Sequence, residues 1–195
     1  MKLNLGCGDD IKSGYVNVDI RKTHPSINVI DLSQLPWPFE TETADEILML
    51  DFLEHFPYRK TSIILMECHR ILTPTGSIVV QVPDAEHLCH DISRDEYYLC
   101  NRCGCNMFTG HEMHDENEEV CQKCGQPADD IAVAAMMRLY GGQDYAGNFH
   151  HTCFTKRLLN LVTEKCGFDM IEDLETEHQT ANWNFKQRFA KRDLW

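Results

Sequence analysis

The chain opens with a short apolar stretch that runs directly into a glycine turn. Residues 2–5 (KLNL) predict a buried strand, and residues 6–8 (GCG) predict the turn that follows it. Residues 15–19 (YVNVD) predict a second strand that ends on the acid Asp19. A strand, a turn whose backbone can approach a ligand, and a carboxylate at the tip of the next strand form the core of a nucleotide or nucleoside pocket. We therefore expect an α/β fold with such a pocket at one edge of its sheet.

The residues after the turn indicate what kind of ligand this pocket would accept. The third glycine of the dinucleotide fingerprint is missing, and Asp9, Asp10 and Ile11 follow instead. Two acids beside the turn would repel a pyrophosphate but tolerate a ligand that has no phosphate and carries a cationic centre. S-adenosylmethionine, with its sulfonium, is such a ligand, and Asp19 would accept hydrogen bonds from its ribose hydroxyls. The alternative is a plain strand turn with no ligand.

The rest of the chain completes an α/β pattern. Further strands are predicted at residues 27–32, 44–50, 77–82, 168–174 and 183–190, and helices at residues 57–72 and 154–166. We expect a Rossmann-like, doubly wound and mostly parallel sheet. Only about ten residues separate the first strand from the second, and a similar number separate the second from the third. A helical crossover usually needs more, so the early helices should be trimmed and one face of the sheet thinly covered.

With these strands in order, the chain resembles the class I S-adenosylmethionine-dependent methyltransferases, and within them short predicted members with an N-terminal LNLGCG strand. The matching segments are residues 5–8 (LGCG), Asp19, residues 35–39 (LPWPF), residues 52–56 (FLEHF) and residues 67–76 (ECHRILTPTG). The resemblance covers residues 1–83 well and 150–190 loosely. The chain departs from it by lacking a helix before the first strand and the Asn/Asp-Pro-Pro-Tyr motif of exocyclic-amine methylators, so methylation of base amino groups is disfavoured.

The resemblance implies transfer of a methyl group to an unidentified acceptor, which would be a small molecule, a sugar or a protein. The residues expected to bind the cofactor lie at the first turn and at strand ends: Leu5, Gly6, Cys7, Gly8, Asp19, Ile20, Asp31, Leu32, Leu50, Asp51 and His55. One alternative is a catalytically silent binding protein with the same fold, which uses its cysteine-rich insertion to hold a partner. A nicotinamide-dependent oxidoreductase is a third class, which the missing glycine and the two acids disfavour.

Two Cys-x2-Cys pairs predict a metal site. Cys100 and Cys103 are separated from Cys121 and Cys124 by 17 residues, the spacing of a four-cysteine zinc ribbon. Four thiolates fill the tetrahedral shell of Zn²⁺, so the site would be structural rather than catalytic. The alternative is four unrelated buried thiols. Within the zinc interpretation, Cys105, His111 and His114 are competing candidate ligands. We expect residues 95–130 to form this module, inserted into a methyltransferase-like domain of residues 1–94 and 131–195.

Histidines near the predicted strand ends are candidate bases. His55 is the first candidate and His151 the second, although each could merely cap, pack or bind backbone. The glycine-punctuated loop before the last helix supplies the predicted acceptor residues Tyr140, Gln143, Tyr145, His150 and His151. Residues 84–99 and 131–154 would form a cap over this acceptor site. The alternative is an arm that projects away and docks a partner.

Composition limits the partners and the compartment. The net charge is −13, and residues 95–130 hold nine acids against two bases, so nucleic acid is an unlikely partner. No apolar run approaches the roughly 20 residues of a membrane span. Ten cysteines, and a first strand that begins at the N-terminus without room for a leader, favour a reducing cytoplasmic location. A homodimer is a further expectation.

Overall fold

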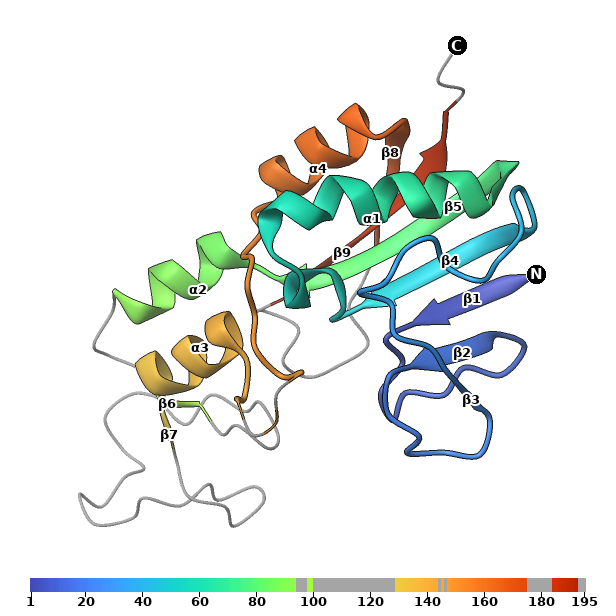
Figure 1. Ribbon diagram of the computed structural model, residues 1–195. Helices are drawn as coiled ribbons and strands as arrows, with labels where there is room; N and C mark the ends of the chain where they lie inside the picture. The colour runs from blue at the N-terminus through green and yellow to red at the C-terminus, as the bar shows by residue number, and fades with distance from the viewer. Residues whose placement is uncertain (94–97, 100–128, 144, 146, 175–183, 193–195) are drawn as a thin grey trace.

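The computed structural model describes residues 1–93, 98–99, 129–143, 145, 147–174 and 184–192 (Figure 1). Its centre is a seven-stranded sheet with the order β3-β2-β1-β4-β5-β9-β8. The strands are β1 (Lys2–Leu5), β2 (Val16–Asp19), β3 (Ile27–Val29), β4 (Ala44–Leu50), β5 (Leu72–Pro83), β8 (Phe168–Leu174) and β9 (Asn184–Lys191). Strands β1 to β5 are parallel, and β9 lies antiparallel between β5 and β8. The sheet is therefore mostly parallel, as predicted.

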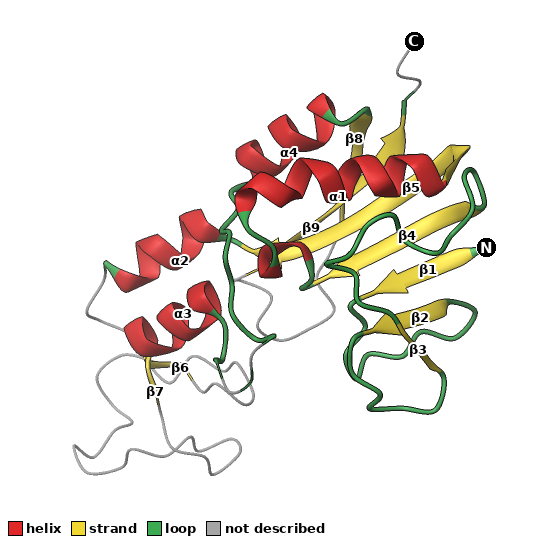
Figure 2. Cartoon of the chain, in the orientation of Figure 1, coloured by secondary structure: helices red, strands yellow, loops and turns green. Residues whose placement is uncertain are grey.

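Two of the helices cover one face of the part of the sheet that holds β5, β9 and β8. The helical elements are the 3-10 turn η1 (Leu53–His55) and the helices α1 (Tyr58–Ile71), α2 (Ala85–Ile92), α3 (Ile131–Tyr140) and α4 (Lys156–Lys165). Helices α1 and α4 lie side by side over β5, β9 and β8 (Figure 2). Helix α1 begins directly after Pro57 and buries one stripe of side chains at helical spacing, Thr61, Ile64, Leu65, Cys68 and Ile71.

The ends of two elements follow from local chemistry. Helix α4 is capped by Thr155, whose hydroxyl accepts a hydrogen bond from the backbone N–H of Leu158 at 3.2 Å, and Gly167 follows its end with a φ of 84°. Strand β5 begins at Leu72 instead of the predicted residue 77, and β3 ends at Val29 instead of residue 32. Residues 73–76, which lie between the predicted helix and the predicted strand, are absorbed into β5 as a register shift, because Leu72 is buried and pairs with Ala44.

The amino-terminal half of the sheet has no helix in its connections. The segments between β1 and β2, between β2 and β3, and between β3 and β4 are all loops (Figure 2). The trimmed crossovers are thus confirmed, and none of the described helices forms the second layer of a doubly wound sheet over this half.

Polar side chains line the face of the sheet that a second helical layer would cover. The amide of Asn4 donates to the Asn17 side chain at 2.9 Å. Glu46 accepts hydrogen bonds from the Tyr15 hydroxyl and the Arg188 guanidinium. These hydrogen bonds pair polar groups on this face that an apolar helix packed over them would leave unpaired. The face is therefore compatible with having no helix over it.

The segment between β5 and α4, called the insertion below, leaves and re-enters the sheet at one point. Asp84, just after β5, forms an isolated bridge with Phe154, and the N–H of Ala85 donates to the Phe154 carbonyl at 2.9 Å. Between these ends, α2 packs against α3, and β6 (Tyr98–Leu99) pairs with β7 (Asp129–Asp130). The predicted zinc ligands Cys100, Cys103, Cys121 and Cys124 lie outside the described residues. Within the described part of the chain, no helix combines the length and apolarity that crossing a membrane requires.

Candidate functional site

A cavity of about 430 Å³ opens at the carboxyl ends of β1, β2 and β4. Strand β1 pairs with β2 on one side and with β4 on the other, so the cavity lies where the strand order reverses. The lining residues are Gly6, Cys7, Gly8, Asp9, Asp10, Asp19, Ile20, Arg21, Ile30, Asp31, Leu32, Ser33, Leu50, Asp51, Phe52, His55, Phe56, Gln81, Tyr145, Gly147 and Lys186. The volume and the mixed polar and apolar lining suit a ligand of nucleoside size.

The glycine turn after β1 forms the floor of this cavity. Gly6 and Gly8 have φ angles of 64° and 50°, a region that favours glycine. A Cβ atom on Gly6 would lie 2.2 Å from Phe52 Cδ2, whereas a Cβ on Gly8 would meet no atom within 4 Å. Gly6 is therefore required by packing, and Gly8 leaves space above the backbone for a ligand.

Asp19 fixes this turn from the end of β2. Its Oδ2 accepts a hydrogen bond from the Gly8 N–H at 2.9 Å, and its Oδ1 accepts one from the Arg21 N–H at 2.8 Å. The carboxylate is largely buried, yet each oxygen keeps a second lone pair, so it can accept further bonds from a ligand in the cavity.

The segment after β3 forms a second wall. Asp31 accepts hydrogen bonds from the Ser33 hydroxyl at 2.6 Å and the Ser33 N–H at 2.9 Å, and these bonds lower the pKa of Asp31. On the open side, the Arg21 guanidinium lies 4.2 Å from the centre of the Tyr145 ring. This cation–π contact connects the acceptor loop predicted at residues 140–151 to the loop after β2.

Asp51, at the end of β4, connects the cavity to the insertion. Its Oδ1 accepts hydrogen bonds from Arg138 on α3 and from Asn184 at the start of β9, both at 3.0 Å. Its Oδ2 accepts one from Gln81 at 3.2 Å. Asp51 has a φ of 51°, so its backbone turns sharply at this junction.

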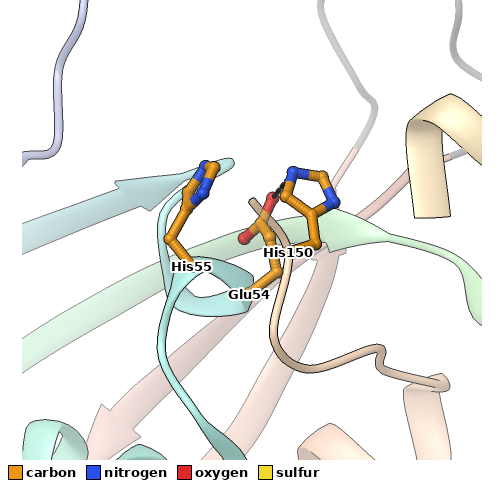
Figure 3. Close-up of side chains that lie close together, drawn as sticks. All are labelled: Glu54, His55 and His150. Carbon is orange, nitrogen blue, oxygen red and sulfur yellow. Dashed lines mark ion pairs between the residues drawn. The ribbon is translucent and has the colours of Figure 1, made fainter. Parts of the chain in front are cut away.

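Beside the cavity, Glu54 is buried with two histidines around it (Figure 3). Its side chain is 1% exposed, and neither carboxylate oxygen has a hydrogen-bond partner. His150 Nε2 lies 4.0 Å from Glu54 Oε1, and the His55 and His150 rings meet edge to face at 4.8 Å.

Burial, together with the negative charge of Asp51, raises the pKa of Glu54 well above its usual range. Burial lowers the pKa of His55, and burial with the nearby His55 lowers the pKa of His150 to about 4.

The backbone holds these three side chains together. The N–H groups of His151 and Thr152 both donate to the Glu54 carbonyl, at 2.8 and 3.2 Å. The Thr152 hydroxyl donates to the Phe56 carbonyl at 2.7 Å. The segment of residues 150–152 is thus fixed against η1, and His55 Nδ1 lies 3.1 Å from the carbonyl of Phe149.

The structure brings most of the predicted cofactor residues to one cavity. Leu5 is the exception, because its side chain is fully buried in the hydrophobic core. Those that line the cavity are Gly6, Cys7, Gly8, Asp19, Ile20, Asp31, Leu32, Leu50, Asp51 and His55.

The predicted acceptor residues separate into two groups. Tyr145 lines the cavity, and His150 joins Glu54 and His55. Tyr140, Gln143 and His151 are exposed and do not line it. Among the candidate bases, His55 is at the cavity, whereas His151 contributes a backbone contact.

The sequence prediction missed several residues in or beside the cavity. Lys186 reaches the cavity from β9, which returns antiparallel and places a late residue beside the first turn. Arg21 lies two residues after Asp19 and could have been found from that spacing. Glu54 stands next to a candidate base, but nothing in the sequence shows that it is buried.

The chain is similar to known proteins in part of its sequence and in its fold. Residues 7–80 match the family model described as a methyltransferase domain, and no curated protein matches the chain. Among solved structures, 1,6-didemethyltoxoflavin-N1-methyltransferase from Burkholderia thailandensis, with bound 1,6-didemethyltoxoflavin and S-adenosylhomocysteine, is similar with a TM-score of 0.55 and 14% identity, over 98% of this chain and 71% of that chain. A methyltransferase from Methanosarcina mazei gives 0.54 and 17%, over 98% and 92%. One from Thermotoga maritima gives 0.55 and 14%, over 98% and 82%. The fold is therefore that of S-adenosylmethionine-dependent methyltransferases.

Proposed function

We propose that this chain is an S-adenosylmethionine-dependent methyltransferase. The observation that carries the proposal is the cavity at the switch point of the sheet, where the glycine turn, Asp19 and Asp31 meet. The match of residues 7–80 to a methyltransferase domain and the fold of the solved relatives support it.

The residues around the cavity fit this cofactor. Asp19 retains lone pairs for the ribose hydroxyls, and the space above Gly8 lets the ligand approach the backbone. Leu32 and Ile30 offer an apolar wall for the adenine, with Asp31 beside it. Asp9 and Asp10 add negative charge for the amino group and the sulfonium. The cofactor supplies an electrophilic methyl group carried on that sulfonium.

The remaining residues would orient the acceptor and limit water. Tyr145 and Arg21 both line the cavity and contact each other, so they would help to hold the reactants in line for displacement. If the accepting atom carries a proton, His55 is the nearest candidate base, because its lowered pKa keeps the imidazole neutral at neutral pH. The acceptor class is proposed as a small molecule, a sugar or a protein group.

Calorimetry on the full chain tests the cofactor class. We expect S-adenosylhomocysteine to bind in the micromolar range and NAD not to bind. Binding of NAD without binding of S-adenosylhomocysteine would contradict the proposal. A second assay follows transfer of a labelled methyl group to a metabolite panel and to protein extracts. Tight cofactor binding without transfer to any acceptor would favour the catalytically silent binding protein.

A further inference from the structure

The cluster of Glu54, His55 and His150 is not explained by cofactor binding. Only His55 of the three lines the cavity. Glu54 is a fully buried carboxylate without a hydrogen-bond donor, and His150 Nδ1 is also buried without a partner. Unsatisfied buried groups of this kind are costly and usually indicate a missing ligand or a functional role.

We propose that Glu54, His55 and His150 bind a divalent transition-metal ion. One ligand atom from each residue lies within 4.8 Å of the other two. Nitrogen and carboxylate ligands hold such ions at about 2.0–2.2 Å, so shifts of roughly 1 Å would bring the three atoms onto one ion. Two imidazoles and one carboxylate are a donor set suited to Zn²⁺ or Fe²⁺.

The hydrogen bonding of His55 suits this role. Its Nδ1 lies 3.1 Å from the Phe149 carbonyl, which can accept only if Nδ1 carries the proton. The proton on Nδ1 leaves the lone pair of Nε2 free to bind an ion. A ligating histidine whose other nitrogen donates to a carbonyl is the usual outer-shell arrangement in metal sites.

The charges around the cluster also favour a cation. Asp51 and Arg138 both face it, and they form an ion pair with a 3.0 Å contact, so their charges largely cancel. The charge of an ionised Glu54 is then uncompensated, and a bound divalent ion would offset the cost of its burial. Helix α3 supplies Arg138 and the following loop supplies His150, so the insertion completes this site.

Three protein ligands leave coordination positions for a further group. Because His55 lines the cavity, an open position would lie at the cavity wall, within reach of an acceptor oxygen or nitrogen. Only this last consequence rests on the proposed methyl transfer. A coordinated His55 cannot act as a base, so activation of the acceptor would fall to the ion as a Lewis acid.

Titration of the full chain with Co²⁺, without S-adenosylmethionine, tests the metal site by itself. We expect visible bands of a nitrogen and oxygen site that appear without near-ultraviolet charge transfer, whereas thiolate ligands of the predicted ribbon would give intense near-ultraviolet charge transfer together with visible bands of their own. Glu54→Gln and His150→Ala should each weaken the binding that gives the visible bands by more than about 100-fold, since even outer-shell changes cost about 10- to 100-fold. The matched control is His151→Ala, which removes the adjacent exposed imidazole and should leave those bands unchanged. Equal binding by all four proteins would overturn the proposal.

A second measurement covers variants that fail to fold. Crystals of the parent protein soaked in Co²⁺ should show an anomalous peak within about 2.3 Å of one Glu54 oxygen and one nitrogen of each histidine. No peak at this position at millimolar Co²⁺ would reject the site. Because neither experiment uses the cofactor, failure here leaves the proposed methyl transfer standing, and failure of the calorimetry leaves the metal site standing.

Discussion

Three carboxylates in this protein show how strongly the immediate surroundings decide what an acid can do. Asp19 accepts two backbone N–H bonds and keeps lone pairs toward the cavity. Glu46 accepts bonds from the side chains of Lys2, Tyr15 and Arg188 on the polar face of the sheet. The Glu54 carboxylate accepts no hydrogen bond from any described residue. The sequence identified Asp19 from its place at a strand end, but it could not distinguish Glu46 from Glu54, because their partners come from residues far away in the chain.

Replacement of Asp19 by alanine should weaken cofactor binding. Loss of a charge-assisted pair of hydrogen bonds costs about 2–4 kcal/mol, which corresponds to a 30- to 1000-fold higher Kd for S-adenosylhomocysteine. Calorimetry measures it, with Asp45→Ala as the control, since Asp45 pairs with the N-terminal amino group far from the cavity. If Asp19→Ala binds S-adenosylhomocysteine as tightly as the parent, the assignment is wrong.

Replacement of Glu46 by glutamine should change how stability depends on pH. Burial opposes ionisation of Glu46, but hydrogen bonds from Tyr15, Arg188 and Lys2 overcome it and lower its pKa to about 2. Its ionised form therefore stabilises the fold above about pH 4.5, and this contribution is lost as the pH falls toward 2. After allowance for solvent screening, we expect Glu46→Gln to be about 1–2 kcal/mol less stable at pH 7. Urea unfolding should show a smaller difference in unfolding free energy between the parent and Glu46→Gln at pH 3 than at pH 7. An equal difference at both pH values would contradict the assignment.

At the scale of elements, the sequence predicted those whose signal is local. The first strand, its glycine turn and helix α1 are set by short-range patterns of apolar residues, Gly and Pro. The start of β5 was missed because a buried Leu72 and its pairing with Ala44 outweigh the turn residues that follow it. The sequence favoured His151 over His150 as a base because, here too, the deciding contacts come from residues far away in the chain. The backbone bonds of this segment to distant carbonyls, those of Glu54 and Tyr140, fix which of the two adjacent rings faces inward.

The four-cysteine module remains a prediction at this scale. We expect one zinc ion per chain on Cys100, Cys103, Cys121 and Cys124 in protein purified without added zinc. Elemental analysis under reducing conditions measures it, and Cys100→Ser with Cys124→Ser should lose this ion while any ion at Glu54 is retained. Chelation should unfold residues near 95–130 first, because small metal modules take much of their folding free energy from the ion. A metal-free parent protein with an intact module would contradict this prediction.

For the whole molecule, the two halves of the sheet differ in what holds them. The half with β4, β5, β9 and β8 lies against α1 and α4, whereas β2 and β3 are joined by loops, and β3 has only three residues. We expect backbone amides of β2 and β3 to exchange with deuterium at least tenfold faster than those of β4 and β5, since local opening is easier where few apolar contacts close over the strands. Exchange measured by mass spectrometry with and without S-adenosylhomocysteine checks this. The ligand should slow β2 most, because Asp19 ends that strand, and uniform protection in the free protein would contradict the expectation.

The bridge between Asp84 and Phe154 holds the two ends of the intervening segment next to each other. Because those two residues are already neighbours, a short linker could join them without disturbing any strand pairing of the seven-stranded sheet. The segment that such a linker would replace carries Arg138 and His150. The sheet could therefore be kept while the proposed metal site is removed.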